Sequence, residues 1–337
     1  MIESMQTQYA AVRDGGAGLI DLSARGRILV SGADAQMFLN GLITNDMKTL
    51  APNTWMPAAF INVQGRLIAA SRVLHRDDGY LIDTEAETRE AVLKLLDRFT
   101  LAGDFRVTDV TDETTQLSVQ GRAAANCIRE TFGARASEIE RRAVLRRSDS
   151  ETWIIRATHT AEDGYDIFVD REESEGIRRK LTTVGVVPID SDTQETLRIE
   201  AGIPCFGIDM DDTTLLPETN LEDEISYSKG CYVGQEIVVR IKHRGHVAKK
   251  LTGIVFVSEH QVTKDAKIFS LDDQEIGRVT SSTFSPRLNK SIALAYVKYD
   301  YLKPETQVRV LSNQSEHAGE VRELPFVSGS WLSTPEE

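Results

Sequence analysis

The sequence predicts an α+β protein that consists of two related ferredoxin-like units followed by a small β-barrel. Strands and helices alternate in the same order twice before about residue 200, and closely spaced short strands begin at Leu251. The composition is that of an ordinary globular chain, with 41% hydrophobic and 27% charged residues among 337. A chain of this length has room for two or three domains.

The first unit follows the order strand, helix, strands, helix, strand. Helical spacing of Met37, Phe38 and Leu42 indicates the first helix, and Gln64-Gly65 marks a turn between two strands. A stripe of apolar residues four or fewer positions apart indicates the second helix. The expected elements are strand 27–31, helix 33–43, strands 56–63, 67–75 and 80–82, helix 92–99 and strand 104–110.

The second unit repeats this architecture without an obvious repeat of sequence. Its elements are strand 116–119, helix 123–131, strands 152–157 and 165–169, and helix 172–181. A further helix, 193–201, ends at Gly202 and Pro204, two residues that terminate helices.

Short strands with turn residues between them predict the barrel. They are expected at 251–257, 267–271, 276–281, 292–297 and 307–310. The predicted domains are therefore 1–245, divided into units of about 19–112 and 113–245, and the barrel domain 246–337.

Charge and cysteine usage restrict the function. The net charge of −13 should repel nucleic acid and anionic membranes, so direct tRNA binding is not expected. The chain has three cysteines, Cys127, Cys205 and Cys231. This small and odd number argues against a disulfide framework and is typical of a protein of the reducing cytoplasm. No apolar run is long enough to cross a bilayer, and the first residues lack the pattern of a signal peptide.

The most informative stretch is Lys-Gly-Cys-Tyr-Val-Gly-Gln-Glu at residues 229–236. Glycines on both sides of Cys231 permit a tight loop, and a nearby lysine favours the reactive thiolate. Cys231 is therefore a candidate activated cysteine. The alternative is a turn with a buried cysteine, because free cysteine is among the most buried residue types.

A basic stretch follows at residues 240–250. It is interpreted either as a solvated strand or hairpin, or as an anion site for a polyglutamate tail, a phosphate or RNA. Metal binding by Cys231, His243 and His246 is disfavoured, since the paired-cysteine spacing of a zinc site is missing, and no resident metal is expected.

These stretches resemble the glycine-cleavage T-protein superfamily of folate-binding proteins. The motif at 229–236, residues 217–221 and Arg240 are similar to its YgfZ branch, bacterial relatives of a mitochondrial iron–sulfur assembly factor. Residues 44–46, 198–202 and 207–211 are similar to the superfamily as a whole. The resemblance implies two entwined α+β units and a barrel around a central channel for tetrahydrofolate or a one-carbon-substituted folate.

The resemblance also implies roles for particular residues. Glu200 matches a glutamate that holds the pterin ring, where one carboxylate accepts two adjacent N–H groups. Asp46 matches an aspartate near the reacting nitrogens, where it would orient a proton or stabilise a cationic intermediate. Asn62 matches a folate-contacting hairpin position.

Four residues of the motif region complete the expected folate site. By charge, Lys229 and Arg240 are expected to face the glutamate carboxylates of the folate, and Gln235 and Glu236 are placed in the same site. T-proteins have Gly-Arg-Glu where this chain has Gly-Gln-Glu at 234–236, and they lack a cysteine at Cys231.

The resulting hypothesis is a folate-binding protein that supports assembly or repair of iron–sulfur clusters, with Cys231 as the active group. Its clients would be iron–sulfur enzymes or assembly proteins, including radical enzymes that modify tRNA. The alternative is a folate-dependent aminomethyl or methyl transferase, which depends on Asp46 and the acidic residues at 209–211. A third reading, a tRNA-binding module using residues 240–250, conflicts with the net acidity.

Overall fold

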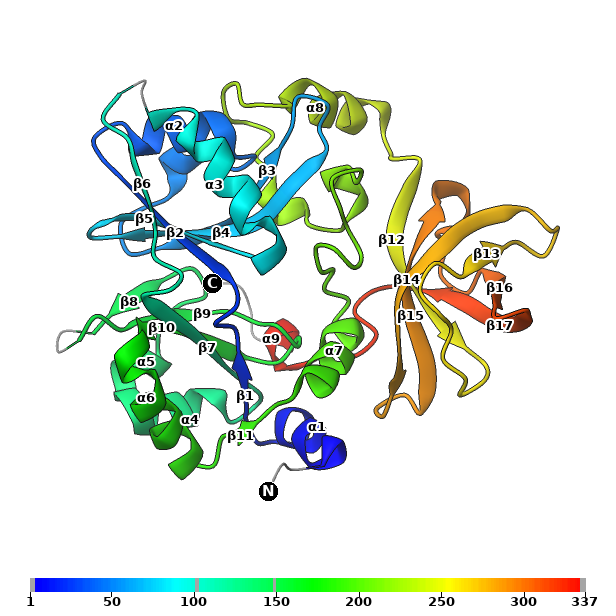
Figure 1. Ribbon diagram of the computed structural model, residues 1–337. Helices are drawn as coiled ribbons and strands as arrows, with labels where there is room; N and C mark the ends of the chain where they lie inside the picture. Colours follow the sequence, from blue (N-terminus) through cyan, green and yellow to red (C-terminus); the bar gives the residue numbers. More distant parts are fainter. Residues whose placement is uncertain (1–3, 101–102, 148–149, 334–337) are drawn as a thin grey trace.

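The computed structural model describes residues 4–100, 103–147 and 150–333. Figure 1 shows three lobes: a sheet with helices at the upper left, a second sheet with helices below it, and a barrel on the right. The predicted α+β fold with a C-terminal barrel is confirmed.

The first lobe is a five-stranded sheet with helices packed against it. Side chains alternate between the two faces of the sheet, and one face packs into the core, where Ile28, Phe60 and Val73 are fully buried. The sheet order is β3 (Trp55–Ile61), β4 (Leu67–Arg76), β5 (Gly79–Thr84), β2 (Gly26–Ser31) and β6 (Arg106–Asp109), with helices α2 (Ala35–Leu42) and α3 (Arg89–Asp97).

The second lobe is a six-stranded sheet. Its order is β11 (Val187–Pro188), β1 (Gly18–Asp21), β7 (Thr114–Gln120), β10 (Gly164–Asp170), β9 (Trp153–Arg156) and β8 (Val144–Arg146). Helices α4 (Ala124–Phe132), α5 (Ala134–Ser137) and α6 (Arg171–Thr183) contribute to its core.

The two lobes exchange chain segments. Strand β1 precedes the whole first sheet in sequence but pairs antiparallel with β7 and parallel with β11 of the second sheet. In the other direction, the segment after α7 (Ser191–Glu200) returns to the first lobe, where Ser226 N donates to Thr44 O. Both units are therefore discontinuous in sequence.

The barrel closes through six antiparallel strands. Their order is β12 (Lys249–Phe256), β15 (Lys290–Lys298), β14 (Glu275–Ser285), β13 (Lys267–Phe269), β16 (Gln307–Ser312) and β17 (Ser315–Arg322). Valine, isoleucine and alanine side chains fill its interior, as expected for a small barrel. After β17 the chain returns to the sheets and ends its described part in α9 (Ser330–Ser333), where Glu162 accepts hydrogen bonds from the amide and hydroxyl of Ser330 (Figure 1).

Some elements differ from the sequence prediction. The strand-or-hairpin interpretation of the basic stretch is wrong over its first half, because α8 (Gln235–Arg244) is helical and packs Val238 into a core cluster. Strands β1 and β17 and the N-terminal helix α1 (Met5–Arg13) have no counterpart in the prediction. They are short, or mostly polar, so hydrophobic periodicity gives little signal.

Candidate functional site: a central channel and a cysteine loop

A channel of about 1230 Å³ lies between the two sheets. One stretch of its wall is apolar and includes Met56, Ala70, Met210 and Leu221. Residues from the second lobe, such as His159, and Trp331 of α9 line it as well. Pockets for small molecules usually combine an apolar wall with a few convergent polar groups, and this channel fits that description.

Buried charges form one polar wall of the channel. Arg72 on β4 bridges two carboxylates, with Nε 2.8 Å from Asp83 Oδ2 and Nη2 2.6 Å from Asp166 Oδ2. His159 Nε2 lies 3.0 Å from Asp166, and Arg25 Nε donates to Asp83 at 2.7 Å. Burial alone would raise the pKa of Asp166, but His159 and Arg72 hold it well below its usual range. This wall is an internally neutralised network.

Two other carboxyl groups line the channel with little positive charge around them. Glu85 follows β5, and its Oε2 accepts the amide of Phe206 at 2.8 Å and the thiol of Cys205 at 3.4 Å. Glu224 ends the short helix η5 (Glu222–Glu224). Burial raises the pKa of Glu85, and burial with repulsion by Glu85 raises the pKa of Glu224 well above its usual range.

Asp46 lies beside the channel rather than in its wall. Its neighbour Asn45 is a lining residue. Asp46 Oδ1 accepts the amide of Lys48 at 3.0 Å and caps the short helix η1 (Met47–Thr49). The carboxylate is half-buried, and the predicted catalytic role of Asp46 stays a prediction.

Lys229 anchors the cysteine loop. Its ammonium donates to the carbonyl oxygens of Asn40, Ile43 and Asn45 at 2.7, 2.9 and 2.6 Å. Burial lowers its pKa to about 8, although Asp46 opposes the shift. Three acceptors are the full complement of an ammonium group. Lys229 therefore holds the loop on the end of α2, and the expected contact with glutamate carboxylates would require it to give up at least one of the three.

The anchored loop presents Cys231 on the outside of the molecule. Tyr232 is buried in the core beneath it, whereas Cys231 is exposed. Gln235 closes the loop through weak contacts of 3.4 Å with the carbonyl oxygens of Lys229 and Gly230. The buried-turn alternative for Cys231 is therefore wrong.

The other motif residues lie around this loop and not in the channel wall. Asn62 closes its own hairpin, since Oδ1 accepts the amides of Gln64 and Arg66 at 2.9 and 3.1 Å. Glu236 and Arg240 are exposed on α8. The structure thus brings Cys231, Asn62 and Gln235 into one region, separate from the residues that line the channel.

Glu200 is fully buried at the end of α7 and does not line the channel. Its two carboxylate oxygens accept Tyr9 Oη at 2.8 and 2.9 Å, Arg13 Nη2 at 2.9 Å and the hydroxyl of Ser285. These partners come from α1 and the barrel. Protein donors thus bond both oxygens of Glu200, and the carboxylate joins α1 to the barrel. The expected contact of Glu200 with the pterin ring stays a prediction.

Sequence reasoning missed the charged lining residues Arg72, Glu85, His159 and Glu224, and the buried Asp166 that pairs with Arg72 and His159. They come from both lobes and from a loop, so no local motif groups them. The one available signal was a polar residue at a core-facing strand position, as at Asp166 between buried residues of β10.

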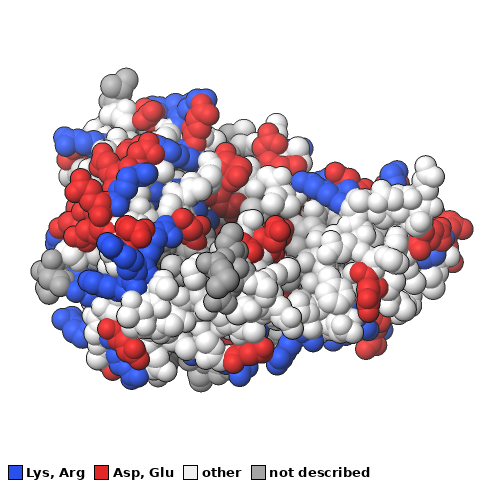
Figure 2. Space-filling view, turned by 60° about the horizontal axis from the view of Figure 1, so that its bottom comes forward, with Lys and Arg blue, Asp and Glu red and all other residues white. Residues whose placement is uncertain are grey.

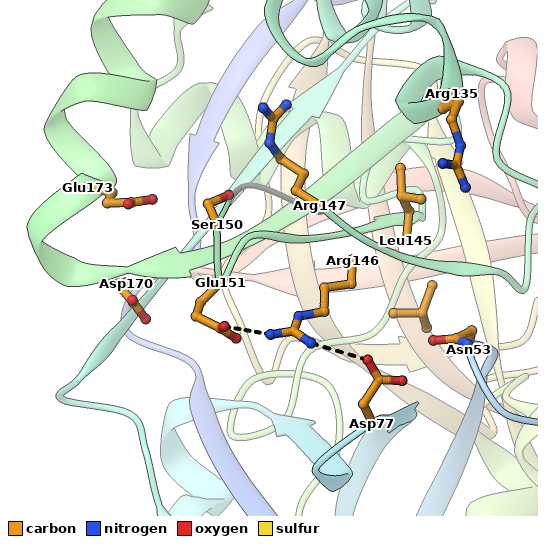
Figure 3. Close-up of a pocket in the computed structure, with 11 residues that line it drawn as sticks. Asn53, Asp77, Arg135, Leu145, Arg146, Arg147, Ser150, Glu151, Asp170 and Glu173 are labelled. Carbon is orange, nitrogen blue, oxygen red and sulfur yellow. Dashed lines mark hydrogen bonds and ion pairs between the residues drawn. The ribbon is translucent and has the colours of Figure 1, made fainter.

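A second hollow of about 840 Å³ lies on the outside, at the edge of the second lobe. Figure 3 shows Arg146 between Glu151 and Asp77, with Nη–Oε and Nη–Oδ distances of 2.6 and 3.4 Å. Arg146 is 42% exposed, so these ion pairs are solvated. The hollow is an open surface whose charged lining includes this ion-paired group.

One face of the surface is shown in Figure 2. Acidic and basic side chains lie intermixed mainly on the left of this face, and uncharged residues cover much of the rest. In the described ranges 4–100, 103–147 and 150–333, no group of three or more histidine, cysteine or acidic residues is placed to hold a metal ion. Over those same ranges, no helix has the length and apolarity needed to span a membrane.

The fold and channel define a two-lobed α+β protein with a barrel appended to it. The GCVT N-terminal domain matches residues 1–229, and the glycine cleavage T-protein C-terminal barrel domain matches residues 249–328. The chain belongs to the glycine cleavage T-protein family.

Known relatives cover most of the chain. It is 30% identical to an aminomethyltransferase of Alcanivorax borkumensis over 86% of this chain and 79% of the relative. It is 27% identical to the aminomethyltransferase of Thermoanaerobacter pseudethanolicus over 92% of this chain and 85% of the relative. The crystal structure of the glycine cleavage system aminomethyltransferase T from Bartonella henselae superposes with a TM-score of 0.88 at 21% identity, covering 96% of this chain and 90% of that one, which shows the shared fold.

Proposed function

We propose that the protein binds a tetrahydrofolate in the central channel and takes part in one-carbon transfer of the aminomethyl type. The observation that carries this proposal is the channel itself, which lies between the two lobes of a chain whose relatives are aminomethyltransferases over most of its length. Its volume of about 1230 Å³ is above the roughly 300–1,000 Å³ of ordinary ligand pockets, which suits a long ligand with a ring at one end and a charged tail at the other.

The lining residues fit such a ligand. Met56, Met210 and Leu221 offer an apolar surface to a planar ring. Arg141 and Arg142 also line the channel, and their guanidinium groups lie 4.4 and 4.7 Å from the ring centroids of Trp331 and Trp55. These cations would hold the carboxylates of a glutamate tail. The folate would supply the nitrogens that carry the one-carbon group.

Two measurements test this function. Anaerobic calorimetry should show stoichiometric binding of tetrahydrofolate. Formation of methylene-tetrahydrofolate from an aminomethyl donor should then be lost in Asp46→Ala with binding retained, and retained in the control Lys48→Ala, whose side chain is exposed two residues away. Absence of tetrahydrofolate binding would overturn the proposal, and turnover by Asp46→Ala would remove Asp46 from the mechanism.

A second candidate is support of iron–sulfur enzymes of the kind associated with the YgfZ branch. Cys231 favours it, because the loop holds this thiol rigidly on the surface, where a client protein has access. Cells that lack the homologous gene would be supplied with wild type, Cys231→Ala or the neighbouring control Ser228→Ala. Restored activity of a four-iron enzyme by wild type and Ser228→Ala, but not by Cys231→Ala, would support this role. Full rescue by Cys231→Ala would exclude it for the cysteine.

A further inference from the structure

We propose that Glu85 and Glu224 form a paired carboxyl subsite in the channel that binds a nitrogen group rich in N–H donors, of the amine or amidine class. The inference rests on the proposed function in one respect, that the channel is where the ligand binds. It assigns this part of the channel to two residues that the sequence motifs do not include.

The two residues reach the channel from different parts of the fold. Glu85 is the residue between β5 and the short helix η2 (Ala86–Thr88), and Glu224 ends η5. Both line the channel. Protein contacts hold both residues: Thr44 donates its hydroxyl to the backbone carbonyl oxygen of Glu224, and the Glu85 carboxylate receives the amide of Phe206. The subsite is therefore held in place before any ligand binds.

Glu224 carries the argument because one of its carboxylate oxygens has no hydrogen-bond partner among the described residues. Its residue is 7% exposed, and no donor within the described part of the chain bonds its Oε2, which is buried. A buried polar atom without a hydrogen bond costs free energy and calls for an explanation. A ligand N–H group that reaches this oxygen through the channel would satisfy it.

The surrounding charges select for a donor-rich ligand. Arg25 is the cation nearest to Glu85, but its Nε is bonded to Asp83. Besides Arg25 and the Phe206 amide, the groups that act on the pair add negative charge or a weak donor: Glu87 and Cys205 beside Glu85, and Asp223 beside Glu224. Burial raises the pKa of Glu85, and burial with repulsion by Glu85 raises the pKa of Glu224. A cationic group would reverse these shifts, so its binding should release protons.

The apolar residues of the channel restrict the chemical class of the ligand further. Ile203, Pro204, Met210 and Leu221 line the same channel. Apolar side chains beside two carboxyl groups suit a planar ligand group with N–H donors on its edge. The two faces of such a group would pack against the apolar side chains, and its N–H donors would bond the carboxyl groups. An amidine or aminopyrimidine edge has this shape, and one carboxylate can accept two parallel N–H groups from it.

The test uses two probes, methylguanidine and tetrahydrofolate, in separate calorimetric titrations of the full chain. Glu224→Gln and Glu85→Gln are compared with wild type and with Glu113→Gln, an exposed glutamate outside the channel wall. We expect both pair variants to bind each probe about tenfold more weakly or worse, since a charge-assisted hydrogen bond is lost. Proton release on methylguanidine binding, measured in two buffers, should fall in the same variants.

The outcomes separate this inference from the proposed function. Binding of both probes that is equal in wild type, Glu224→Gln and Glu85→Gln overturns the subsite and leaves folate binding intact. Binding of methylguanidine that depends on Glu224, without binding of tetrahydrofolate, supports the subsite and overturns the proposed function. If neither probe binds to wild type, both are overturned. Glutamine keeps the size of glutamate and removes the buried charge, so the variants should fold.

Discussion

A Cβ atom added to Gly234 would lie 2.4 Å from the carbonyl oxygen of Asn62. Gly234 has φ of +79° and precedes α8, so the start of this helix is pressed against the β3–β4 hairpin. The contact joins the cysteine loop to the first sheet. This contact explains why a glycine is needed at the second glycine position of the 229–236 motif without invoking a ligand.

Gly234→Ala should therefore lower the free energy of unfolding by about 1–3 kcal/mol, the cost of a non-glycine residue in a left-handed conformation, with the clash added to it. Urea denaturation monitored by circular dichroism measures the change. Gly230→Ala is the matched control, because a Cβ there meets nothing within 4 Å. Equal loss of stability in the two variants would contradict this account.

Lys229→Met should destabilise the protein by about 1–3 kcal/mol, because three buried carbonyl oxygens lose their donor. The loss should depend on pH. The pKa of Lys229 is lowered to about 8 from 10.5, so the unfolded chain binds more protons between these values, and the stability of the wild type should rise with pH in that window relative to the variant.

Unfolding titrations of wild type and Lys229→Met at pH 7.5 and 9.5 give this difference directly. The exposed Lys48→Met serves as the control and should track the wild type at both values. A stability difference between wild type and Lys229→Met that is the same at both pH values would show that the lysine is not titrating in this range.

Glu200→Gln should loosen the N-terminal helix. Arg13 and Tyr9 both bond this carboxylate, and breaking a buried ion pair from one side costs about 3–5 kcal/mol. Hydrogen exchange of the backbone amides in α1 should accelerate, while tetrahydrofolate affinity changes by less than about threefold, because Glu200 does not line the channel. Abolished folate binding with unchanged exchange in α1 would instead support the pterin-holding role expected from the sequence.

Thiol labelling should distinguish the three cysteines. Cys231 is exposed, Cys127 is buried, and burial with the nearby Glu85 carboxylate raises the pKa of Cys205 far above its usual range. Iodoacetamide at pH 8 should therefore modify Cys231 first and Cys205 and Cys127 much more slowly. Mass spectrometry of peptides over time gives the rates, and rapid labelling of Cys205 would show that its environment is more open than the structure indicates.

The sequence predicted the architecture better than the site. Helical spacing located α2, and strand-length apolar runs located most of the barrel, because these signals are local. The sequence also singled out Cys231, which the structure leaves exposed, while its role as an activated cysteine stays a prediction.

The channel could not be predicted in this way, since its charged residues meet only after two sheets pack. Glu200 and Lys229 show the opposite difficulty: both are singled out by sequence, and both are engaged by protein partners. A motif shows that a residue matters, but it does not show whether the residue contacts a ligand or the fold.

The position of β1 has a consequence for biosynthesis. A ribosome releases residues 18–21 long before 114–120 and 187–188, the strands that flank β1 in the finished sheet. The second lobe must therefore wait for its parallel neighbour to emerge, while β2 to β6 of the first lobe are already available for pairing. The two lobes cannot be expressed as independent halves by cutting at one point, because any such cut separates β1 from its sheet or removes the returning segment from the first lobe. The two lobes are therefore expected to fold only as parts of one continuous chain.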